Sequence, residues 1–123
     1  MKQHSPRFLQ LVETVKTRIQ EITPQQLKAK IDQAEPLCII DVRDENEWPS
    51  GRIAGAITLS KGVIERDIEK QIPDVTTPIV VYCSGGFRCA LVADSLQNMG
   101  YSKIYSLNGG LSAWVQAGYP LVK

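Results

Sequence analysis

A cysteine that directly follows a predicted buried strand is the residue of this sequence best placed for chemistry. Residues 79–82 form a short apolar run typical of a strand buried on both faces, and Cys83 comes next. The glycine-rich turn 84–88 follows, ahead of a helix expected over 90–99. Backbone N–H groups in such a turn converge on an anion, and a helix N-terminus adds a partial positive charge. Both favour the thiolate, so the sequence predicts that Cys83 is a nucleophile.

The composition limits how that thiol could be activated. The chain has one histidine, His4, which lies in a segment expected to be a frayed tail. A core Cys–His dyad of the protease type is therefore not expected, and the pKa of Cys83 should be lowered by backbone dipoles and arginine. An inert core thiol beside a tight turn is the less favoured interpretation, because ligands of open α/β sheets gather at the carboxyl ends of strands.

An acidic and a basic residue follow the second predicted buried strand. This strand covers residues 37–40 and runs into Asp41 and Arg43. If the two strands are parallel neighbours, their carboxyl ends share one edge of the sheet, so the pair should lie beside the cysteine turn. We expect Asp41 and Arg43 to form an ion-pair brace that includes Glu47. Arg88, the cation of the turn, either meets an anionic substrate or braces the turn by pairing with Asp41 or Glu47.

The rest of the chain alternates between helical and strand patterns. A helix starting at Ser5-Pro6, an edge strand within 18–22 and a helix opened by a capping box at Thr23 precede the strand at 37–40. A strand near 56–59, a helix within 61–72, a strand at 104–107 and a closing helix complete the pattern. This alternation predicts an α/β domain with a parallel sheet covered on both faces. The helical side chains expected to be buried are Phe8, Leu9, Val12, Val15, Ile19, Leu27, Ile31, Ala34, Ile64, Ile68, Ile72, Leu91, Val92, Leu96, Met99, Leu111, Trp114 and Val115.

Composition and charge narrow the range of functions. The chain has 123 residues, of which 43% are hydrophobic and 22% charged, as expected for one globular domain. Its net charge of +1 gives no reason to expect nucleic acid or an anionic membrane as a partner. No signal peptide and no membrane-spanning run is expected. The three cysteines include no CxxC pair, so we expect no disulfide scaffold, no metal site, no cofactor and a reducing, cytoplasmic setting.

Four short segments share their order and spacing with a known family. They are Asp41-Val42-Arg43 with Glu47, the run 51–56, the turn 83–88 and the run 109–114. Together they resemble the rhodanese (thiosulfate sulfurtransferase) family. The resemblance implies a rhodanese-like three-layer domain over 21–123, with a central parallel sheet of about five strands, and an N-terminal helical extension over 1–20. Arg52 stands where family members often have histidine, and it either adds positive potential near the pocket or simply lies in solvent.

The resemblance also implies a sulfurtransferase with Cys83 as its catalytic residue. The thiolate would take the outer sulfur of thiosulfate or of a low-molecular-weight persulfide, and would pass it to cyanide, to another thiol or to a thioredoxin-like protein. Thiosulfate is the less favoured physiological donor because the turn has one cation. The implied substrate-binding loop consists of Ser84, Gly85, Gly86, Phe87, Arg88 and Cys89, and the implied supporting residues are Asp41, Arg43, Glu47 and Arg52.

Two other functions remain as alternatives. The domain could carry sulfur or sense redox state, with Cys89 as a resolving thiol that forms a disulfide with Cys83, although Cys89 could equally be a small packing residue. A phosphatase or arsenate reductase of the dual-specificity type is disfavoured. In those enzymes a histidine precedes the cysteine and the loop is one residue longer, whereas here Tyr82 precedes Cys83 and only Ser84 to Phe87 separate it from Arg88.

Overall fold

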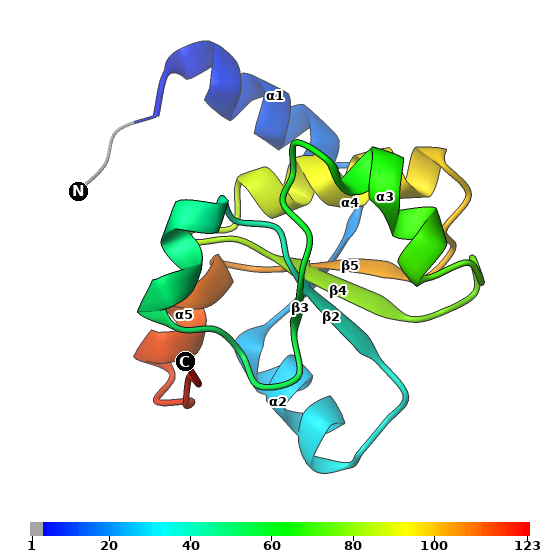
Figure 1. The fold of residues 1–123 in the computed structure, drawn as a ribbon. Helices are drawn as coiled ribbons and strands as arrows, with labels where there is room; N and C mark the ends of the chain where they lie inside the picture. Colours follow the sequence, from blue (N-terminus) through cyan, green and yellow to red (C-terminus); the bar gives the residue numbers. More distant parts are fainter. Residues whose placement is uncertain (1–3) are drawn as a thin grey trace.

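The computed structural model describes residues 4–123, which fold around a sheet of five parallel strands. The strands lie in the order β1-β5-β4-β2-β3, so β4 is the central strand (Figure 1). In chain order, the elements are α1 (Pro6–Lys16), β1 (Gln20–Ile22), α2 (Pro24–Asp32), β2 (Cys38–Asp41), the 3₁₀ helix η1 (Glu45–Ser50), β3 (Ile57–Thr58), α3 (Ile64–Gln71), β4 (Ile79–Tyr82), α4 (Arg88–Asn98), β5 (Ile104–Leu107) and α5 (Gly110–Gln116). The predicted parallel sheet with alternating helices is confirmed.

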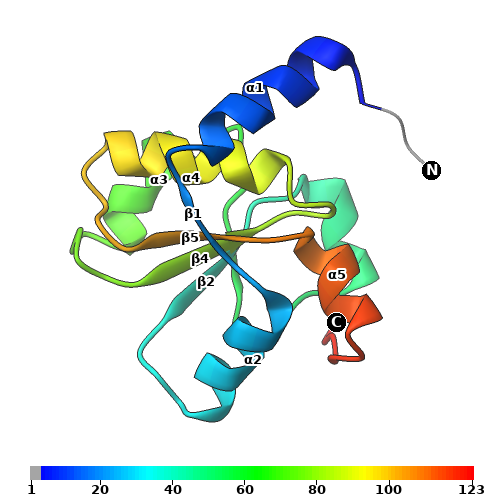
Figure 2. The ribbon, with the colours of Figure 1, turned by 180° about the vertical axis from the view of Figure 1, so that it is seen from behind.

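Helices lie on both sides of the sheet, which gives the molecule three layers. α1, α3 and α4 lie on one side, and α2 and α5 lie on the other (Figure 1; Figure 2). Each side has its own hydrophobic core, because successive side chains of a strand point to opposite faces of the sheet. In β4, Ile79 and Val81 pack in the core that α3 and α4 cover, whereas Val80 and Tyr82 pack in the core that α2 and α5 cover.

The pairing of β2 with β4 brings the two candidate site segments to one edge of the sheet. Ile40 pairs with Val81, and Asp41 pairs with Tyr82. On the other side of β4, Ile79 pairs with Ile104 at the start of β5. All these strands are parallel, so the segments that follow β2, β4 and β5 leave the sheet at the same edge. The cysteine turn therefore lies between the Asp41 segment and the turn into α5.

Several helix predictions are confirmed and others are wrong. The capping box of α2 is present: the Thr23 hydroxyl accepts from the Gln26 N–H at 3.1 Å, and the Gln26 side chain accepts from the Thr23 N–H at 2.9 Å. In α3, the isoleucines at four-residue spacing are buried as predicted. The side chains that were expected to be buried but are exposed are Leu9, Ile31, Ala34, Met99 and Val115. Ala34 and Met99 lie beyond the last residues of their helices, whereas Leu9, Ile31 and Val115 lie within helices on the side that faces solvent.

The buried face of α4 is made of smaller residues than the sequence pattern suggested. The helix begins at Arg88, two residues earlier than predicted, which brings Cys89 into its first turn. Cys89, Ala90 and Ala93 are buried together with Val92 and Leu96. Small side chains allow the helix to approach the sheet closely, so the start of α4 lies directly against the cysteine turn.

The first helix packs on the outer side of α4. Val12 and Val15 are buried against Ala90, and the Arg18 Nε donates to Asp94 Oδ1 at 2.7 Å. This contact fixes the direction of α1, whose N-terminal end lies near the start of α4. Along residues 4–123, none of the helices combines the length and the apolarity that a membrane crossing requires.

Candidate active site

Cys83 lies at the carboxyl end of the central strand, and two backbone amides point at its sulfur. The Sγ accepts from the Gly86 N–H at 3.2 Å and from the Cys89 N–H at 3.4 Å. The side chain is 1% exposed, yet it belongs to the lining of a cavity of about 740 Å³. The pKa of Cys83 is lowered from the ordinary 9.0 to about 6, chiefly by a hydrogen bond from the Cys89 thiol. Burial opposes this shift, while the two N–H groups and the charge of Arg88 reinforce it.

Two glycines make the turn possible. Gly86 has a φ of +93°, and a Cβ on it would lie 2.8 Å from the backbone nitrogen of Gly109. Gly110 has a φ of +60°, and a Cβ on it would lie 2.5 Å from the carbonyl oxygen of Cys83. Side chains are excluded at both positions because of the positive φ and because of the close backbone approach. The Gly109-Gly110 pair of the sequence thus serves the cysteine turn directly.

The start of α5 fixes the carbonyl groups of the turn. The Leu111 N–H donates to the Cys83 carbonyl at 2.8 Å, and the Ser112 N–H donates to the Ser84 carbonyl at 2.9 Å. With the carbonyls held on this side, the N–H groups of the following residues are free to face the sulfur. α5 therefore sets the orientation of the amides around Cys83.

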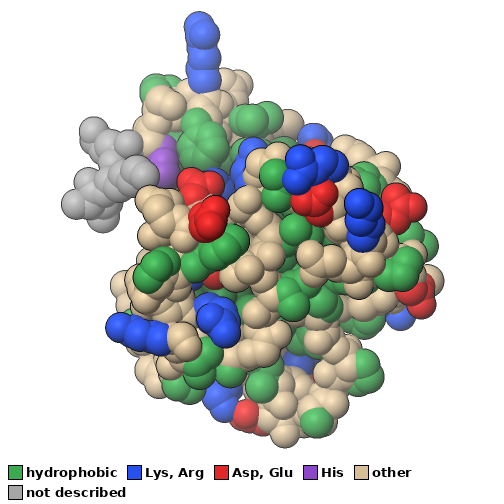
Figure 3. Space-filling model, in the orientation of Figure 1, with side chains coloured by type: hydrophobic (Ala, Val, Ile, Leu, Met, Phe, Trp, Pro, Cys, Tyr) green, Lys and Arg blue, Asp and Glu red, His purple; other side chains and the backbone are tan. Residues whose placement is uncertain are grey.

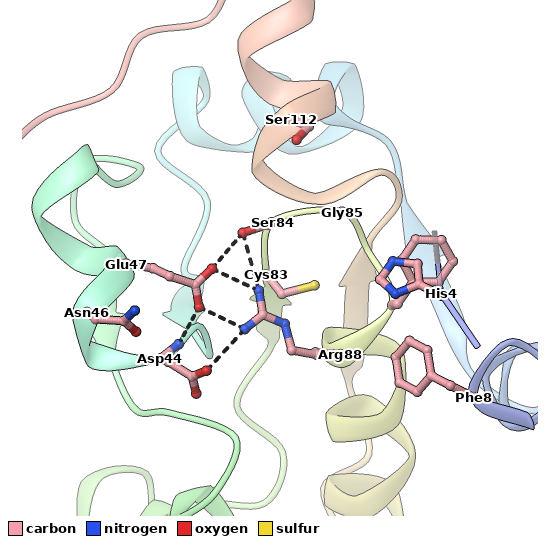
Figure 4. A pocket seen from close by; sticks show the side chains of 11 residues that line it. His4, Phe8, Asp44, Asn46, Glu47, Cys83, Ser84, Gly85, Arg88 and Ser112 are labelled. Carbon is pink, nitrogen blue, oxygen red and sulfur yellow. Dashed lines mark hydrogen bonds and ion pairs between the residues drawn. The ribbon is translucent and has the colours of Figure 1, made fainter. Parts of the chain in front are cut away.

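Arg88 braces the turn by pairing with Glu47 of η1. Its Nη1 lies 2.8 Å from Glu47 Oε2, its Nη2 lies 3.0 Å from Oε1, and a longer contact of 3.7 Å reaches Asp44 (Figure 4). The Ser84 hydroxyl donates to Glu47 at 3.0 Å. The hydrogen bonds from Arg88 are the main reason that the pKa of Glu47 is lowered to about 2. Of the alternatives for Arg88, pairing with Glu47 is the one observed.

The expected brace between Asp41 and Arg43 is present, but Glu47 does not belong to it. Arg43 Nη2 lies 2.8 Å from Asp41 Oδ2, with both side chains buried, and the Tyr82 hydroxyl donates to the same oxygen at 3.1 Å. Arg43 also donates to the carbonyl of Gly51 at 2.7 Å. Glu47 lies on η1 and faces the cysteine turn instead. The prediction that Glu47 joins the Asp41–Arg43 pair was therefore wrong. The 3₁₀ helix η1, which follows Arg43, directs the Glu47 carboxylate toward Arg88 and away from that pair.

Arg52 lies away from the cavity. Its backbone forms an antiparallel bridge with Val122, with N–H to carbonyl distances of 2.8 Å in both directions. The side chain is half-buried and is not among those that line the space in front of Cys83. Its position gives it no direct contact with a substrate at the sulfur.

Cys89 is a buried thiol next to the nucleophile. It is fully buried at the start of α4, and the Ser106 hydroxyl donates to its sulfur at 3.1 Å. Its pKa is raised well above the ordinary value, chiefly by its hydrogen bond with Cys83 and by burial. Cys89 therefore stays protonated at a pH at which Cys83 ionises.

The N-terminal segment forms part of the cavity wall, which the sequence did not suggest. The His4 ring lies 4.6 Å from the Phe87 ring and 5.2 Å from the Phe8 ring, measured between centroids. The expectation of a frayed tail at His4 was wrong. The cavity residues that sequence reasoning missed are His4, Phe8, Asp44, Asn46 and Ser112.

Metal binding finds no support in the residues that the structure describes. Within 4–123, the histidine, cysteine, aspartate and glutamate side chains form no group of three that could hold a metal ion. The polar groups around Cys83 are instead arranged as hydrogen-bond donors to sulfur and as a carboxylate–guanidinium brace.

The structure is a parallel α/β domain with a cysteine at the carboxyl end of its central strand, held in a loop of backbone amides. Residues 23–117 match the model of the rhodanese-like domain, and the chain therefore belongs to the rhodanese-like domain family. This confirms both the resemblance and the fold class that the sequence motifs implied. The family includes proteins named as enzymes.

Individual relatives carry different names. A tRNA uridine(34) hydroxylase from Chlamydia abortus is 31% identical over 102 residues, which cover 78% of this chain and 31% of that protein. A structure of thiosulfate sulfurtransferase from Pseudomonas aeruginosa has a TM-score of 0.82 at 26% identity, covering 91% of this chain and 21% of that one. A protein of unknown function from Rhodopseudomonas palustris, named a possible tyrosine phosphatase, has a TM-score of 0.84 at 30% identity and covers 99% of both chains. The chain spans about a third or less of the length of the curated relatives that it matches.

Proposed function

We propose that this domain transfers sulfane sulfur through a persulfide on Cys83. The observation that carries the proposal is the pair of N–H donors, from Gly86 and Cys89, on a sulfur whose pKa is lowered to about 6. At neutral pH such a thiol is mostly thiolate, which is the form that attacks another sulfur. The sulfur donor would be thiosulfate or a low-molecular-weight persulfide.

Each half of the cycle forms one bond to sulfur and breaks another. The Cys83 thiolate attacks the outer sulfur of the donor; a bond forms between the two sulfurs, and the donor's own S–S bond breaks. Sulfite leaves from thiosulfate, whereas a thiolate leaves from an organic persulfide. An acceptor then attacks the outer sulfur on Cys83 and restores the thiolate. Cyanide, a low-molecular-weight thiol or a thioredoxin-like protein would serve as this acceptor.

The surroundings of Cys83 suit a charged persulfide. The N–H groups of the turn are fixed before the reaction, so they stabilise negative charge without rearranging. Arg88 adds a positive charge, but its hydrogen bonds to Glu47 make it chiefly a brace of the turn. The cavity in front of the sulfur provides space for the added atom and for its acceptor.

Cys89 is better suited to donating a hydrogen bond than to resolving a disulfide. A resolving thiol would attack the Cys83 persulfide, form the Cys83–Cys89 disulfide and expel hydrosulfide. Attack requires a thiolate, and the raised pKa of Cys89 disfavours that form. Its interaction with Cys83 is instead the largest cause of the lowered pKa of Cys83, and its sulfur also lies 3.9 Å from the Leu107 carbonyl oxygen. We therefore prefer transfer over a redox-sensing function for this domain.

Phosphatase activity is not part of the proposal. The turn leaves Ser84 to Phe87 between the cysteine and Arg88, and the Arg88 guanidinium is already paired with Glu47. A phosphoryl group would need several N–H donors and a free guanidinium on its oxygens. We expect no hydrolysis of p-nitrophenyl phosphate. Hydrolysis that disappears in Cys83→Ser would contradict this assignment.

We place the reaction in a reducing, cytoplasm-like setting. A persulfide cycle needs Cys83 free, and the three cysteines of the chain are all free thiols. The mixed charges of the chain, with a net +1, give neither nucleic acid nor a membrane surface a reason to bind, so small sulfur compounds and a thioredoxin-like acceptor protein remain the proposed partners.

Intact-protein mass spectrometry after exposure to sulfur donors tests the proposal. We expect the protein to gain one sulfur atom that cyanide removes, and we expect Cys83→Ser to gain none. Cys38→Ser is the matched control, because Cys38 is a half-buried thiol outside the cavity and its loss should leave the labelling unchanged. Labelling that survives in Cys83→Ser, or that no donor produces in the unaltered protein, would overturn the proposal.

A further inference from the structure

Three aromatic rings form one wall of the cavity that contains Cys83. His4 and Phe8 come from the N-terminal segment, and Phe87 comes from the cysteine turn itself. The ring centroids of His4 and Phe87 are 4.6 Å apart, and those of Phe8 and Phe87 are 6.2 Å apart. These separations are typical of aromatic rings in contact. The wall exists because α1 packs on α4, which brings the N-terminal segment next to the cysteine turn that precedes α4.

The opposite wall carries negative charge. Figure 4 shows Asp44 and Glu47 on one side of Cys83, and His4 and Phe8 on the other. Arg88 lies between them, but its two terminal nitrogens already contact both carboxylates and the Ser84 hydroxyl. A small anion would therefore have to displace a carboxylate from Arg88. Otherwise it would approach the two carboxylates and the thiolate without a hydrogen bond from a terminal nitrogen of Arg88. Both routes cost electrostatic energy.

The Lys16 ammonium near the aromatic wall does not offset the negative charge of the opposite wall. The Lys16 ammonium lies 5.8 Å from the centroid of Phe87, but it also lies 3.6 Å from Glu21 and outside the cavity lining. In the space-filling view, the histidine side chain lies next to hydrophobic side chains and close to acidic ones (Figure 3). The mouth of the cavity thus combines an apolar side with an acidic side.

The size of the cavity also exceeds what an inorganic donor requires. Its volume of about 740 Å³ lies within the range of pockets that enclose organic ligands. Thiosulfate would fill a small part of it and would leave the aromatic wall without a partner. An organic group attached to the reacting sulfur would reach that wall while its sulfur lies at Cys83.

We propose that His4, Phe8 and Phe87 select organic thiols and persulfides that carry an uncharged aromatic or other apolar group, over small sulfur compounds that carry a negatively charged group. The inference rests on the proposed sulfur transfer. A persulfide R–S–SH gives its outer sulfur to Cys83 and leaves as the thiolate RS⁻, and a thiol acceptor takes that sulfur in the reverse sense. In both steps, the R group packs on the aromatic wall, away from Asp44 and Glu47.

Acceptor selectivity is the measurement that tests this inference. Cys83 is first loaded with sulfur from inorganic polysulfide, and the transfer rate is then measured to benzyl mercaptan and to 2-mercaptoethanesulfonate. We expect benzyl mercaptan to be preferred by about tenfold or more, since an aromatic contact and a repelled anion act in the same direction. Phe8→Ala and His4→Ala should each reduce that ratio by about three- to tenfold.

Leu9→Ala is the matched control for Phe8→Ala. Leu9 is exposed, neighbours Phe8 in the same helix and does not line the cavity, so its replacement should leave the ratio unchanged. A purely structural role of Phe8 would lower both rates together and would not alter their ratio. An unaltered ratio in both cavity variants, or a preference of the original protein for the sulfonate, would overturn the inference. If neither inorganic polysulfide nor a low-molecular-weight persulfide adds sulfur to Cys83, the proposed function itself fails, whereas loading by the persulfide alone supports the inference.

Discussion

Replacing Cys89 by alanine should raise the pKa of Cys83. The Cys89 thiol is the largest cause of the lowered pKa, whereas its backbone N–H, which alanine keeps, is a separate donor at 3.4 Å. A hydrogen bond to a charged group contributes about 1.5–3 kcal/mol, and one pKa unit corresponds to about 1.4 kcal/mol. We therefore expect the pKa to rise from about 6 by roughly one to two units.

The rate of alkylation by iodoacetamide as a function of pH measures this pKa, because the thiolate is the reactive form. The measurement belongs in a Cys38→Ser background, since Cys38 is a half-buried thiol that would react as well. For a shift in the middle of the expected range, the thiolate fraction at pH 7 falls from about nine-tenths to about a quarter. Sulfur loading at that pH should slow by a similar factor.

Cys89→Ser separates the hydrogen bond from the packing. Serine keeps a donor of nearly the same size, so the pKa of Cys83 should remain close to 6. A thermal melt of each variant shows whether the domain is intact. If the alanine variant titrates like the unaltered protein, the backbone amides alone hold the thiolate and the role assigned to the Cys89 side chain is refuted.

Three further changes probe the frame around the site. Gly110→Ala should lower the free energy of unfolding by more than about 3 kcal/mol in urea titrations, because the new Cβ would lie 2.5 Å from the carbonyl oxygen of Cys83. Gly85→Ala is the control. A Cβ there would lie 3.6 Å from its nearest neighbour, so the free energy of unfolding should change by less than about 1 kcal/mol. Asp41→Asn leaves Arg43 charged and buried and should cost about 3–5 kcal/mol in the same titration; a loss below 1 kcal/mol would contradict the brace. Glu47→Gln should cost about 1 kcal/mol at pH 7, a modest figure because the pair is partly exposed. The folded pKa of Glu47, about 2, lies below the ordinary 4.5, so its stabilisation is complete above pH 4.5 and disappears toward pH 2; a difference between the two proteins that is constant with pH would oppose this.

The strands and the cysteine turn were accessible to sequence reasoning because local patterns determine them. A continuous apolar run predicts a buried strand, and Gly85-Gly86 after a cysteine predicts a turn of amides. The parallel sheet followed from the alternation of elements, and it correctly placed the end of β2, at Asp41, beside the end of β4, at Tyr82. These features depend on residues that are neighbours in the sequence or on one rule of sheet topology.

The pairing of charges and the N-terminal wall depend on tertiary geometry. The sequence offered Arg88 two possible partners, Asp41 and Glu47. Only the orientation of η1 determines that Arg88 forms its ion pair with Glu47. His4 reaches the cavity because α1 packs along α4 in one direction, and no local pattern specifies that direction. Ile31 and Met99 show a related limit: an apolar residue at helical spacing is exposed when it lies on the side that faces solvent or beyond the end of its helix.

The contact between α5 and the cysteine turn has a consequence during synthesis of the chain. The carbonyls of Cys83 and Ser84 are held by N–H groups of Leu111 and Ser112, which the ribosome adds much later. Before these residues are added, the turn lacks the two N–H groups that hold its carbonyls, and the contacts of Glu47 with Arg88 and Ser84 are left to brace it. The full set of contacts that surrounds the nucleophile is therefore complete only in a chain that extends at least as far as Ser112.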